Sequence, residues 1–217
     1  ALLAPSYAAG LYPLVPEQIV RNLGTLGFDE IWETAVGAEY VIDSSAEYAE
    51  ANGGRILLSS PCPTFVNLIE KHFPDLIANL IPVGSPMIVT GRIIREKYKG
   101  QEVSIVFIGP CIAKKDEIMQ EQYEGCIDAA LTYEELRQMF RDMKETDGER
   151  AVPYYSASPK GRQITLSGGI ISNYKGRFPE DRLNSCDGIE NCIELIRHIE
   201  RSGRDGVQDA QIYDVLG

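Results

Sequence analysis

Short apolar runs alternate with amphipathic stretches along most of the chain. The runs at residues 56–58 and 103–108 are apolar and rich in branched side chains, which predicts buried parallel strands. Further strands are expected over residues 29–34, 129–131, 183–186 and 209–215. Apolar residues recurring every three or four positions predict helices over residues 17–26, 42–52, 63–73, 87–99, 132–143 and 189–199. This alternation predicts an α/β fold with mostly parallel sheets flanked by helices.

Local signals mark two helix ends and one seam. Thr132 and Glu135 have the spacing of a capping box at a helix start, and Gly53-Gly54 is a common helix stop. The polar turn at residues 98–101 predicts a boundary between two lobes. We expect these lobes to span residues 1–99 and 100–217, each with its own mostly parallel sheet.

Composition narrows the classes of function. The chain has 217 residues, enough for a sizeable core, and its net charge of −11 argues against nucleic acid as a partner. No run approaches the roughly 18 apolar residues of a membrane span, so no membrane partner is expected. Five cysteines without regular spacing do not make a disulfide framework, which favours a reducing, cytoplasmic location.

Two cysteines share one sequence context. Cys62 and Cys111 each follow an apolar run and a proline, and each precedes a helical pattern. Pro63 suits the first position of a helix, which places Cys62 at its N-cap. A helix start, and for Cys111 the nearby Lys114-Lys115, favour the thiolate, the form that binds a soft metal. The alternative is that both cysteines are small buried apolar side chains.

Other candidate features carry weaker signals. Gly168-Gly169 precedes an apolar helical pattern and could cradle an anion, or it could simply form a tight turn. Cys126, Cys186 and Cys192 lack the Cys-x-x-Cys spacing typical of zinc sites. We expect Cys186 and Cys192 to lie in the core.

Several motifs together point to one family. Residues 59–63 read Ser-Ser-Pro-Cys-Pro, and residues 109–114 read Gly-Pro-Cys-Ile-Ala-Lys. They resemble the Thr-Ser-Cys-Cys-Pro and Met-Pro-Cys-x-x-Lys motifs of the catalytic domain of iron-only ([FeFe]) hydrogenases. The opening Ala4-Pro5-Ser6, the segment 167–169 and the run 211–217 are similar to further family segments, in the family's order. The resemblance covers nearly the whole chain and suggests a divergent, sensory-type member.

The resemblance implies an iron–sulfur cofactor in a cleft between two lobes. In the family, a [4Fe–4S] cubane held by four cysteines is linked to a two-iron centre that carries CO and cyanide. By motif position, Cys62 and Cys111 would be two cubane ligands, and Lys114 would donate a hydrogen bond to a cyanide. The residues that would line the cofactor are Ala4, Pro5, Ser6, Pro61, Gly109 and Pro110. Gly109 stands in place of the motif's methionine, which would leave a hole beside the cofactor or room for another group.

The family's third motif supplies the remaining two cubane ligands. By resemblance, it would begin directly after Gly217. We therefore expect the parent protein to continue beyond this position, and we expect this segment alone to carry no cluster.

The resemblance also implies an altered proton route. Pro61 stands where active members have a cysteine that passes protons to the two-iron centre. Ser44, Ile81 and Glu47 stand at the later relay positions, and among these four residues only the Glu47 carboxyl is titratable. Since a relay needs ionisable or hydroxyl groups in contact, turnover should be low.

Three functions remain open at this stage. The parent protein could sense H2 or redox state, with a redox partner such as ferredoxin or a downstream signalling domain. It could instead be a hydrogenase that oxidises or evolves H2 by another proton route. It could also be an iron–sulfur scaffold or maturation protein without a two-iron centre. Lys114 mildly favours a two-iron centre, and the altered relay favours the sensor.

Overall fold

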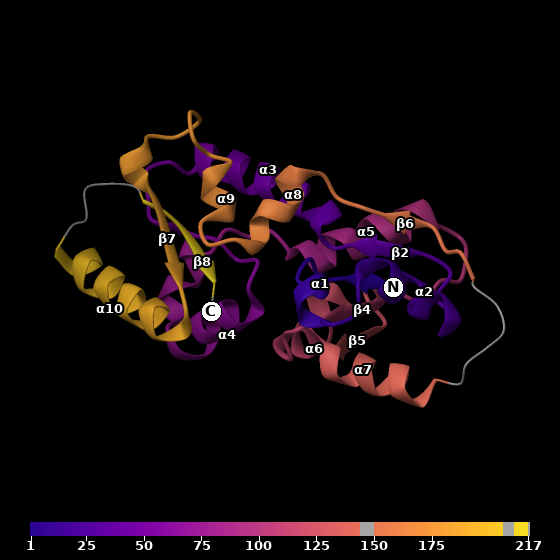
Figure 1. Cartoon of the computed structure of the whole chain (residues 1–217). Coiled ribbons are helices and arrows are strands. Elements are labelled where there is room, and N and C mark those ends of the chain that lie inside the picture. The colour runs from indigo at the N-terminus through magenta and orange to yellow at the C-terminus, as the bar shows by residue number, and fades with distance from the viewer. Residues whose placement is uncertain (144–149, 206–210, 217) are drawn as a thin grey trace. The chain divides into compact units, whose positions relative to one another are not determined.

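The computed structural model describes residues 1–143, 150–205 and 211–216 (Figure 1). The chain forms two compact units, each assembled from two separate stretches. Unit 1 comprises Ala1–Ala38 and Pro86–Arg162, and unit 2 comprises Glu39–Ser85 and Gln163–Gly217. This division differs from the expected one at residues 99 and 100, which both lie in unit 1. The reason is that strands from distant parts of the chain pair in the same sheet, so each unit combines segments that are far apart in sequence.

Unit 1 is built on a five-stranded sheet in which every pairing is parallel. Its strand order is β5-β4-β1-β2-β6. The strands are β1 (Leu2–Leu3), β2 (Ile31–Glu33), β4 (Val106–Gly109), β5 (Ala129–Thr132) and β6 (Tyr154–Tyr155). The helices are α1 (Tyr7–Gly10), α2 (Pro16–Thr25), α5 (Pro86–Lys97), α6 (Ala113–Glu117), α7 (Tyr133–Asp142) and α8 (Pro159–Arg162), with a short 3-10 helix at Glu121–Tyr123.

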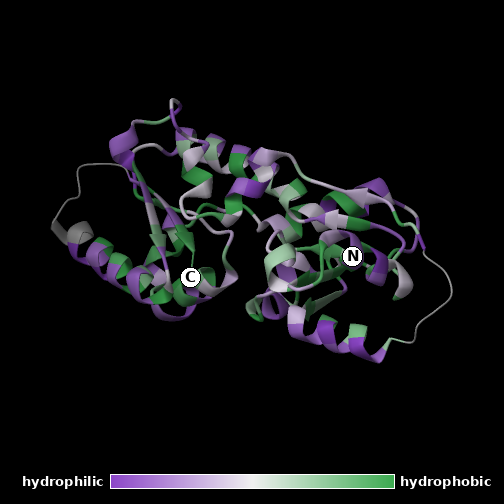
Figure 2. Ribbon diagram, in the orientation of Figure 1, coloured by the Kyte–Doolittle hydropathy of each residue, from purple (hydrophilic) through white to green (hydrophobic). Residues whose placement is uncertain are grey.

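The core of unit 1 lies on the central strands. Leu2, Leu3, Ile31 and Ile108 are fully buried, because helices cover both faces of the sheet. Figure 2 shows these strands in green, while α7 carries alternating green and purple stripes. The apolar stripe of α7 faces the core through Leu136, which is also fully buried.

Unit 2 is built on a three-stranded parallel sheet with the order β3-β8-β7. The strands are β3 (Leu57–Leu58), β7 (Leu183–Asp187) and β8 (Ile212–Leu216). The helices are α4 (Pro63–His72), α9 (Gly169–Ser172) and α10 (Ile189–Asp205), with short 3-10 helices at Pro74–Asn79, Gln163–Thr165 and Glu180–Arg182. In Figure 1, α4 and α10 lie on one side of this sheet and α9 on the other. α3 (Ala35–Ala51) begins in unit 1 and ends in unit 2.

Most expected elements are present, with informative differences at their ends. The helix expected from residue 42 begins at Ala35, because Ala35, Ala38 and the close contact of Gly37 with Thr90 bury its first turns. The strand expected from residue 103 begins at Val106, because Arg95 and Asp128 bond the backbone of the preceding residues. Residues 209 and 210 of the last expected strand lie outside the described residues.

No helix in the described part of the chain is long and apolar enough to cross a membrane.

Candidate functional site

The neighbours β1 and β4 form a topological switch point in unit 1. The chain leaves β1 toward β2 on one side and leaves β4 toward β5 on the other. In open parallel sheets, ligands bind beyond the carboxyl ends of two such strands. Ala4-Pro5-Ser6 follows β1, and Pro110-Cys111 follows β4. The amide of Ala4 donates to the carbonyl of Ile108 (2.9 Å), which holds the two segments side by side.

Gly109 allows these two strand ends to approach. A Cβ at this position would lie 2.5 Å from the ring of Phe107 and 3.0 Å from the Cβ of Ala4. The first distance is shorter than real Cβ contacts, and the second is tight enough that the neighbour would have to shift slightly. Of the two alternatives expected at Gly109, room for another group agrees with the structure, because the ring of Phe107, only 3% exposed, lies against this glycine.

Ser6 is held by a buried tyrosine. The hydroxyl of Tyr133 donates to the carbonyl of Ala4 (3.3 Å) and is hydrogen-bonded to the hydroxyl of Ser6 (2.8 Å). Burial raises the pKa of Tyr133 to about 12, so the phenol keeps its proton. Since that proton points to Ala4, the hydroxyl of Ser6 is the donor in the other bond. Tyr133 thus fixes the loop after β1, while Pro5 is partly buried and Ser6 is exposed.

Lys114 forms an ion pair that is mostly buried. Its Nζ lies 2.6 Å from Oε2 of Glu117, and the two side chains are 12% and 6% exposed. Both belong to α6, one turn apart, directly after Cys111. The carboxylate therefore neutralises and orients the ammonium group beside the switch point. Sequence reasoning named Lys114 but missed Glu117, although the three-residue spacing was a usable signal.

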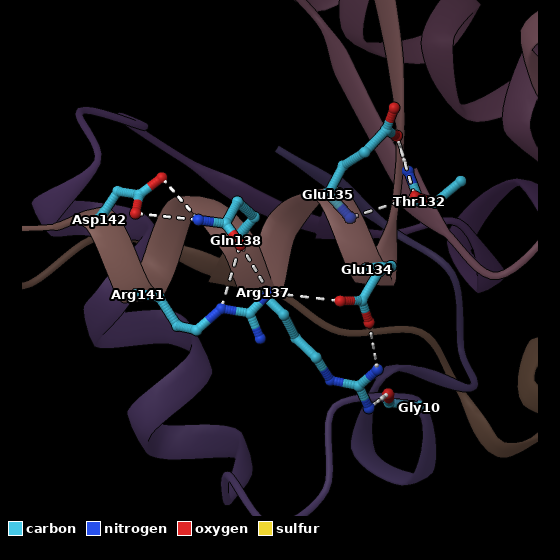
Figure 3. A network of polar contacts seen from close by, with 8 residues as sticks. All are labelled: Gly10, Thr132, Glu134, Glu135, Arg137, Gln138, Arg141 and Asp142. Carbon is cyan, nitrogen blue, oxygen red and sulfur yellow. Dashed lines mark hydrogen bonds and ion pairs between the residues drawn. The ribbon is translucent and has the colours of Figure 1, made fainter.

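The neighbouring Lys115 has a different role. It donates to Glu135 (2.5 Å) at the start of α7, and this hydrogen bond, helped by Thr132, lowers the pKa of Glu135 to about 2. Figure 3 shows the capping box that Thr132 and Glu135 form, which confirms the expected helix start. Along the same helix, Arg137 reaches Glu134 and the carbonyl of Gly10. These contacts join α6, α7 and the end of α1.

In unit 2, Cys62 is the N-cap of α4 and Pro63 is its first residue, as expected. Cys62 and Pro61 are both partly buried and lie beyond the carboxyl end of β3. In unit 1, Cys111 lies two residues before the short helix α6. Both cysteines therefore follow a parallel strand and precede a helix, each in its own unit.

A buried carboxylate that sequence reasoning missed, Asp214, joins several segments at the carboxyl end of the central strand of the unit 2 sheet. Asp214 in β8 accepts hydrogen bonds from the hydroxyl of Ser59 (3.2 Å) and the amide of Ile170 (2.9 Å). Ser59 in turn accepts from the amide of Val215 (2.9 Å). Of the two alternatives for Gly168-Gly169, the tight turn agrees with the structure, because the amide of Gly169 donates to the carbonyl of Leu166 (2.9 Å) and the next amide, of Ile170, binds the chain's own Asp214. Burial raises the pKa of Asp214 to about 6, and the bonds from Ile170 and Ser59 offset part of this rise.

The residues at the expected relay positions all belong to unit 2. Ile81 is 1% exposed, whereas Ser44 and Glu47 lie on an exposed face of α3. The charge of Glu47 helps to raise the pKa of Arg177, although the main cause is the hydrogen bond from Arg177 to Glu50. Glu47 therefore lies on an acidic face of α3 whose negative charge interacts with Arg177.

A second buried carboxylate, also missed, lies at the end of β2. Glu33 is 1% exposed and accepts two hydrogen bonds from Arg162 (2.9 and 2.7 Å) and others from Tyr154 and the amide of Ala157. Tyr154 is also bonded to Tyr7 (2.9 Å). Burial alone would raise the pKa of Glu33, but the bonds from Arg162 and Tyr154 bring it below its ordinary value.

The cysteine chemistry agrees in part with an iron–sulfur group. Thiolates suit iron, and a cubane takes four of them. The resemblance assigns two, Cys62 and Cys111. Among the described residues, no group of three or more histidine, cysteine, aspartate or glutamate side chains is arranged to hold a metal ion. The resemblance therefore accounts for two of the four thiolates that a cubane takes.

The sequence pattern of the family described as "Iron only hydrogenase large subunit, C-terminal domain" matches residues 1–212. The chain belongs to this family. It is 28% identical to iron hydrogenase 1 of Clostridium pasteurianum over 97% of this chain and 40% of that protein. It is also 32% identical to the cytosolic Fe-S cluster assembly factor NAR1 of Vanderwaltozyma polyspora, over 70% of this chain and 35% of that protein.

The fold is that of solved hydrogenases. A variant of the [FeFe]-hydrogenase HydA1 from Chlamydomonas reinhardtii superposes with a TM-score of 0.75 and 17% identity, over all of this chain and 76% of that chain. Within this family, the relatives in sequence include both hydrogenases and iron–sulfur assembly factors. The chain spans about two fifths of the length of iron hydrogenase 1 and about a third of that of NAR1.

Proposed function

We propose that this chain is the cluster-binding part of a hydrogenase-family protein that senses H2 or redox state with little turnover. Cys62 and Cys111 would be two of the ligands of a [4Fe–4S] cluster. Lys114, oriented by Glu117, would donate a hydrogen bond to a cyanide of a linked two-iron centre. That centre would supply the chemistry of H2, with Ala4, Pro5, Ser6, Gly109 and Pro110 around it.

The observation that carries this proposal is the pair Pro61 and Ile81 at the expected relay positions. Neither side chain can take up or release a proton. Ile81 is only 1% exposed, and its buried apolar side chain offers no hydrogen-bonding group to a water chain at its own position. Without proton carriers at these two positions, the cofactor could still bind H2 or accept electrons, but slow proton transfer would limit its turnover.

The test restores proton carriers at both positions. The protein containing this chain, at its natural length and matured with its iron centres, is compared as wild type, Pro61→Cys/Ile81→Ser and Pro61→Ala/Ile81→Ala. We expect slow H2 uptake by wild type and by the alanine variant, and a rise of at least roughly tenfold for Pro61→Cys/Ile81→Ser. Fast uptake by wild type would contradict the sensor and favour an active hydrogenase. Slow uptake by all three would remove the relay argument for the sensor.

The similarity to NAR1 favours a second candidate, an iron–sulfur assembly factor. Such a protein would keep the cubane and need no cyanide or CO ligands. Infrared spectra of the purified protein separate the two, since metal-bound CO and cyanide absorb where proteins do not. Their bands would exclude the assembly factor, and an intact cubane without these bands would exclude the sensor.

We also propose a cytoplasmic location, because the five cysteines do not make a disulfide framework. A redox partner such as ferredoxin follows from the proposed iron–sulfur function. A signalling domain elsewhere in the parent protein would serve the same function.

A further inference from the structure

Cys186 and Cys192 form a dithiol pair at the carboxyl edge of the unit 2 sheet. Cys186 is near the end of β7, and Cys192 lies in the first turns of α10. Their sulfur atoms are 4.0 Å apart, and both cysteines are reduced. Cys192 also contacts the carbonyl of Leu216 at the end of β8 (3.7 Å). Neither cysteine has a role in the function proposed above.

The backbone around the pair is firmly held. Cys186 is in register with Val215 of β8, and the amide of Gly188 donates to the carbonyl of Leu216 (2.8 Å). The amide of Cys192 donates to the carbonyl of Gly188 (3.0 Å), which ties the helix start to the turn. A disulfide needs a sulfur–sulfur distance of about 2.0 Å, so closure requires each sulfur to move by only about 1 Å. Rotation about the side-chain torsions of the two cysteines is the movement that would bring the sulfur atoms together.

The two thiols differ in access. Cys192 is fully buried against the apolar side chains of α4 and α10, whereas Cys186 is partly exposed. A small oxidant from solvent can therefore reach the sulfur of Cys186, whereas the sulfur of Cys192 is shielded from solvent. Burial raises the pKa of both thiols, so they stay protonated and react slowly.

We propose that Cys186 and Cys192 are a reversible oxidation site that closes to a disulfide in the presence of a peroxide. The sulfur of Cys186 attacks the O–O bond of the peroxide, which releases water and leaves a sulfenic acid on Cys186. The sulfur of Cys192 then attacks that of Cys186. The S–S bond forms, the S–O bond breaks, and the oxygen leaves as water with the proton of Cys192. Two thiols and one hydrogen peroxide thus give one disulfide and two waters.

Closure would act on the strand that Asp214 belongs to. The thiol of Cys192 would no longer donate to Leu216, and the disulfide would cross-link the end of β7 to the first turns of α10. Cys62 packs against the same apolar cluster as Cys186. Oxidation of the pair would therefore change the packing at the end of β8 and at the start of α4.

The experiment uses the whole chain with hydrogen peroxide as the probe, followed by alkylation of the remaining thiols, trypsin digestion and mass spectrometry. Cleavage after Arg182 and Arg197 places both cysteines in one peptide. We expect this peptide to lose two hydrogen atoms and both alkylation sites, and to recover both after treatment with a dithiol reductant. Cys126, buried in unit 1, is the internal reference, and its alkylation should fall at least roughly tenfold more slowly.

Two variants sharpen the result. Cys192→Ser should abolish the disulfide and leave Cys186 as a sulfenic acid that a dimedone reagent labels. Cys126→Ser is the matched control and should form the disulfide at the wild-type rate. The proposal is overturned if both cysteines of the peptide remain alkylated after peroxide, or if Cys192 pairs with Cys62 instead. Circular dichroism before and after oxidation verifies that the fold persists in each variant.

Discussion

The hydroxyl of Ser59 donates to the carboxylate of Asp214 across 155 residues of sequence, at 3.2 Å. Ser59 opens the motif that carries Cys62, and Asp214 lies near the end of β8. Asp214 also accepts from the amide of Ile170 at the start of α9. One buried carboxylate therefore joins three segments through which the sequence resembles its family.

Replacing Ser59 with alanine should destabilise the protein. The change leaves the amide of Val215 without its acceptor and Asp214 without one donor, both in a buried setting. We expect a loss of about 1–3 kcal/mol in the free energy of unfolding, measured by urea denaturation. Ser44→Ala on the exposed face of α3 is the control and should change this value by less than about 0.5 kcal/mol. Equal values for the two variants would contradict the role given to Ser59.

Asp214 should make stability depend on pH. Its pKa is raised by burial to about 6 from 3.8, so the folded state binds the proton more tightly than the unfolded state. This contribution is fully present below the unfolded pKa and is lost as pH rises through the folded pKa. Relative to Asp214→Asn, the wild type should lose up to roughly 3 kcal/mol between about pH 4 and pH 7.

Urea denaturation across this pH range measures the difference. Asp75→Asn is the control, because Asp75 is exposed in the same unit, and this variant should follow the wild type. If the wild type gains stability relative to Asp214→Asn over this range, the carboxyl is ionised throughout and the assignment is wrong.

Gly109→Ala should strain the candidate site. The new Cβ would lie 2.5 Å from the ring of Phe107 and 3.0 Å from the Cβ of Ala4, so the buried ring of Phe107 must shift and Ala4 must move slightly. We expect a destabilisation of about 1–3 kcal/mol by thermal or urea unfolding. Gly54→Ala is matched, since its Cβ would meet nothing within 4 Å, and it should be neutral or slightly stabilising. A neutral Gly109→Ala would mean that the space is open.

The pair Lys114 and Glu117 should behave as a buried ion pair. Removing either charge takes away the ion-pair partner of the other in a site where the side chains are 12% and 6% exposed. We expect Lys114→Met and Glu117→Gln each to cost about 3–5 kcal/mol, and the double variant to cost clearly less than their sum. Lys99→Met is the control, because its pair with Glu96 is about three quarters exposed, and it should cost under about 1 kcal/mol. Additive effects of the two Lys114 and Glu117 changes would show that the pair is not coupled.

Local chemistry explains what could be predicted from the sequence. The helix start at Cys62 and Pro63 and the capping box of Thr132 and Glu135 involve residues at most three apart, so they could be identified from the chain alone. The parallel strands could be predicted because burial on both faces requires continuous apolar runs. The resemblance of motifs indicated the family, which the comparison over residues 1–212 confirms.

Contacts between distant residues explain the differences. The sequence left open whether Gly109 creates a hole or makes room for another group, and the ring of Phe107 lies against it. β4 begins later than expected because Arg95 and Asp128, which belong to other segments of the chain, form hydrogen bonds with the backbone that precedes it. The division into units differed from the expected seam because β3 pairs with β8, far along the chain.

The sequence by itself determined the class of fold, the family and the helix start at Cys62, since these depend on periodicity and on neighbouring residues. Only the tertiary structure decided which carboxylates are buried, which neighbours they bind and which thiols lie in contact. Asp214, Glu33 and the pair Cys186 and Cys192 read as ordinary polar or core residues in the chain. Their properties arise because parallel strand pairing places distant segments side by side and removes their side chains from water, where charge and proton affinity are set by the few groups within reach.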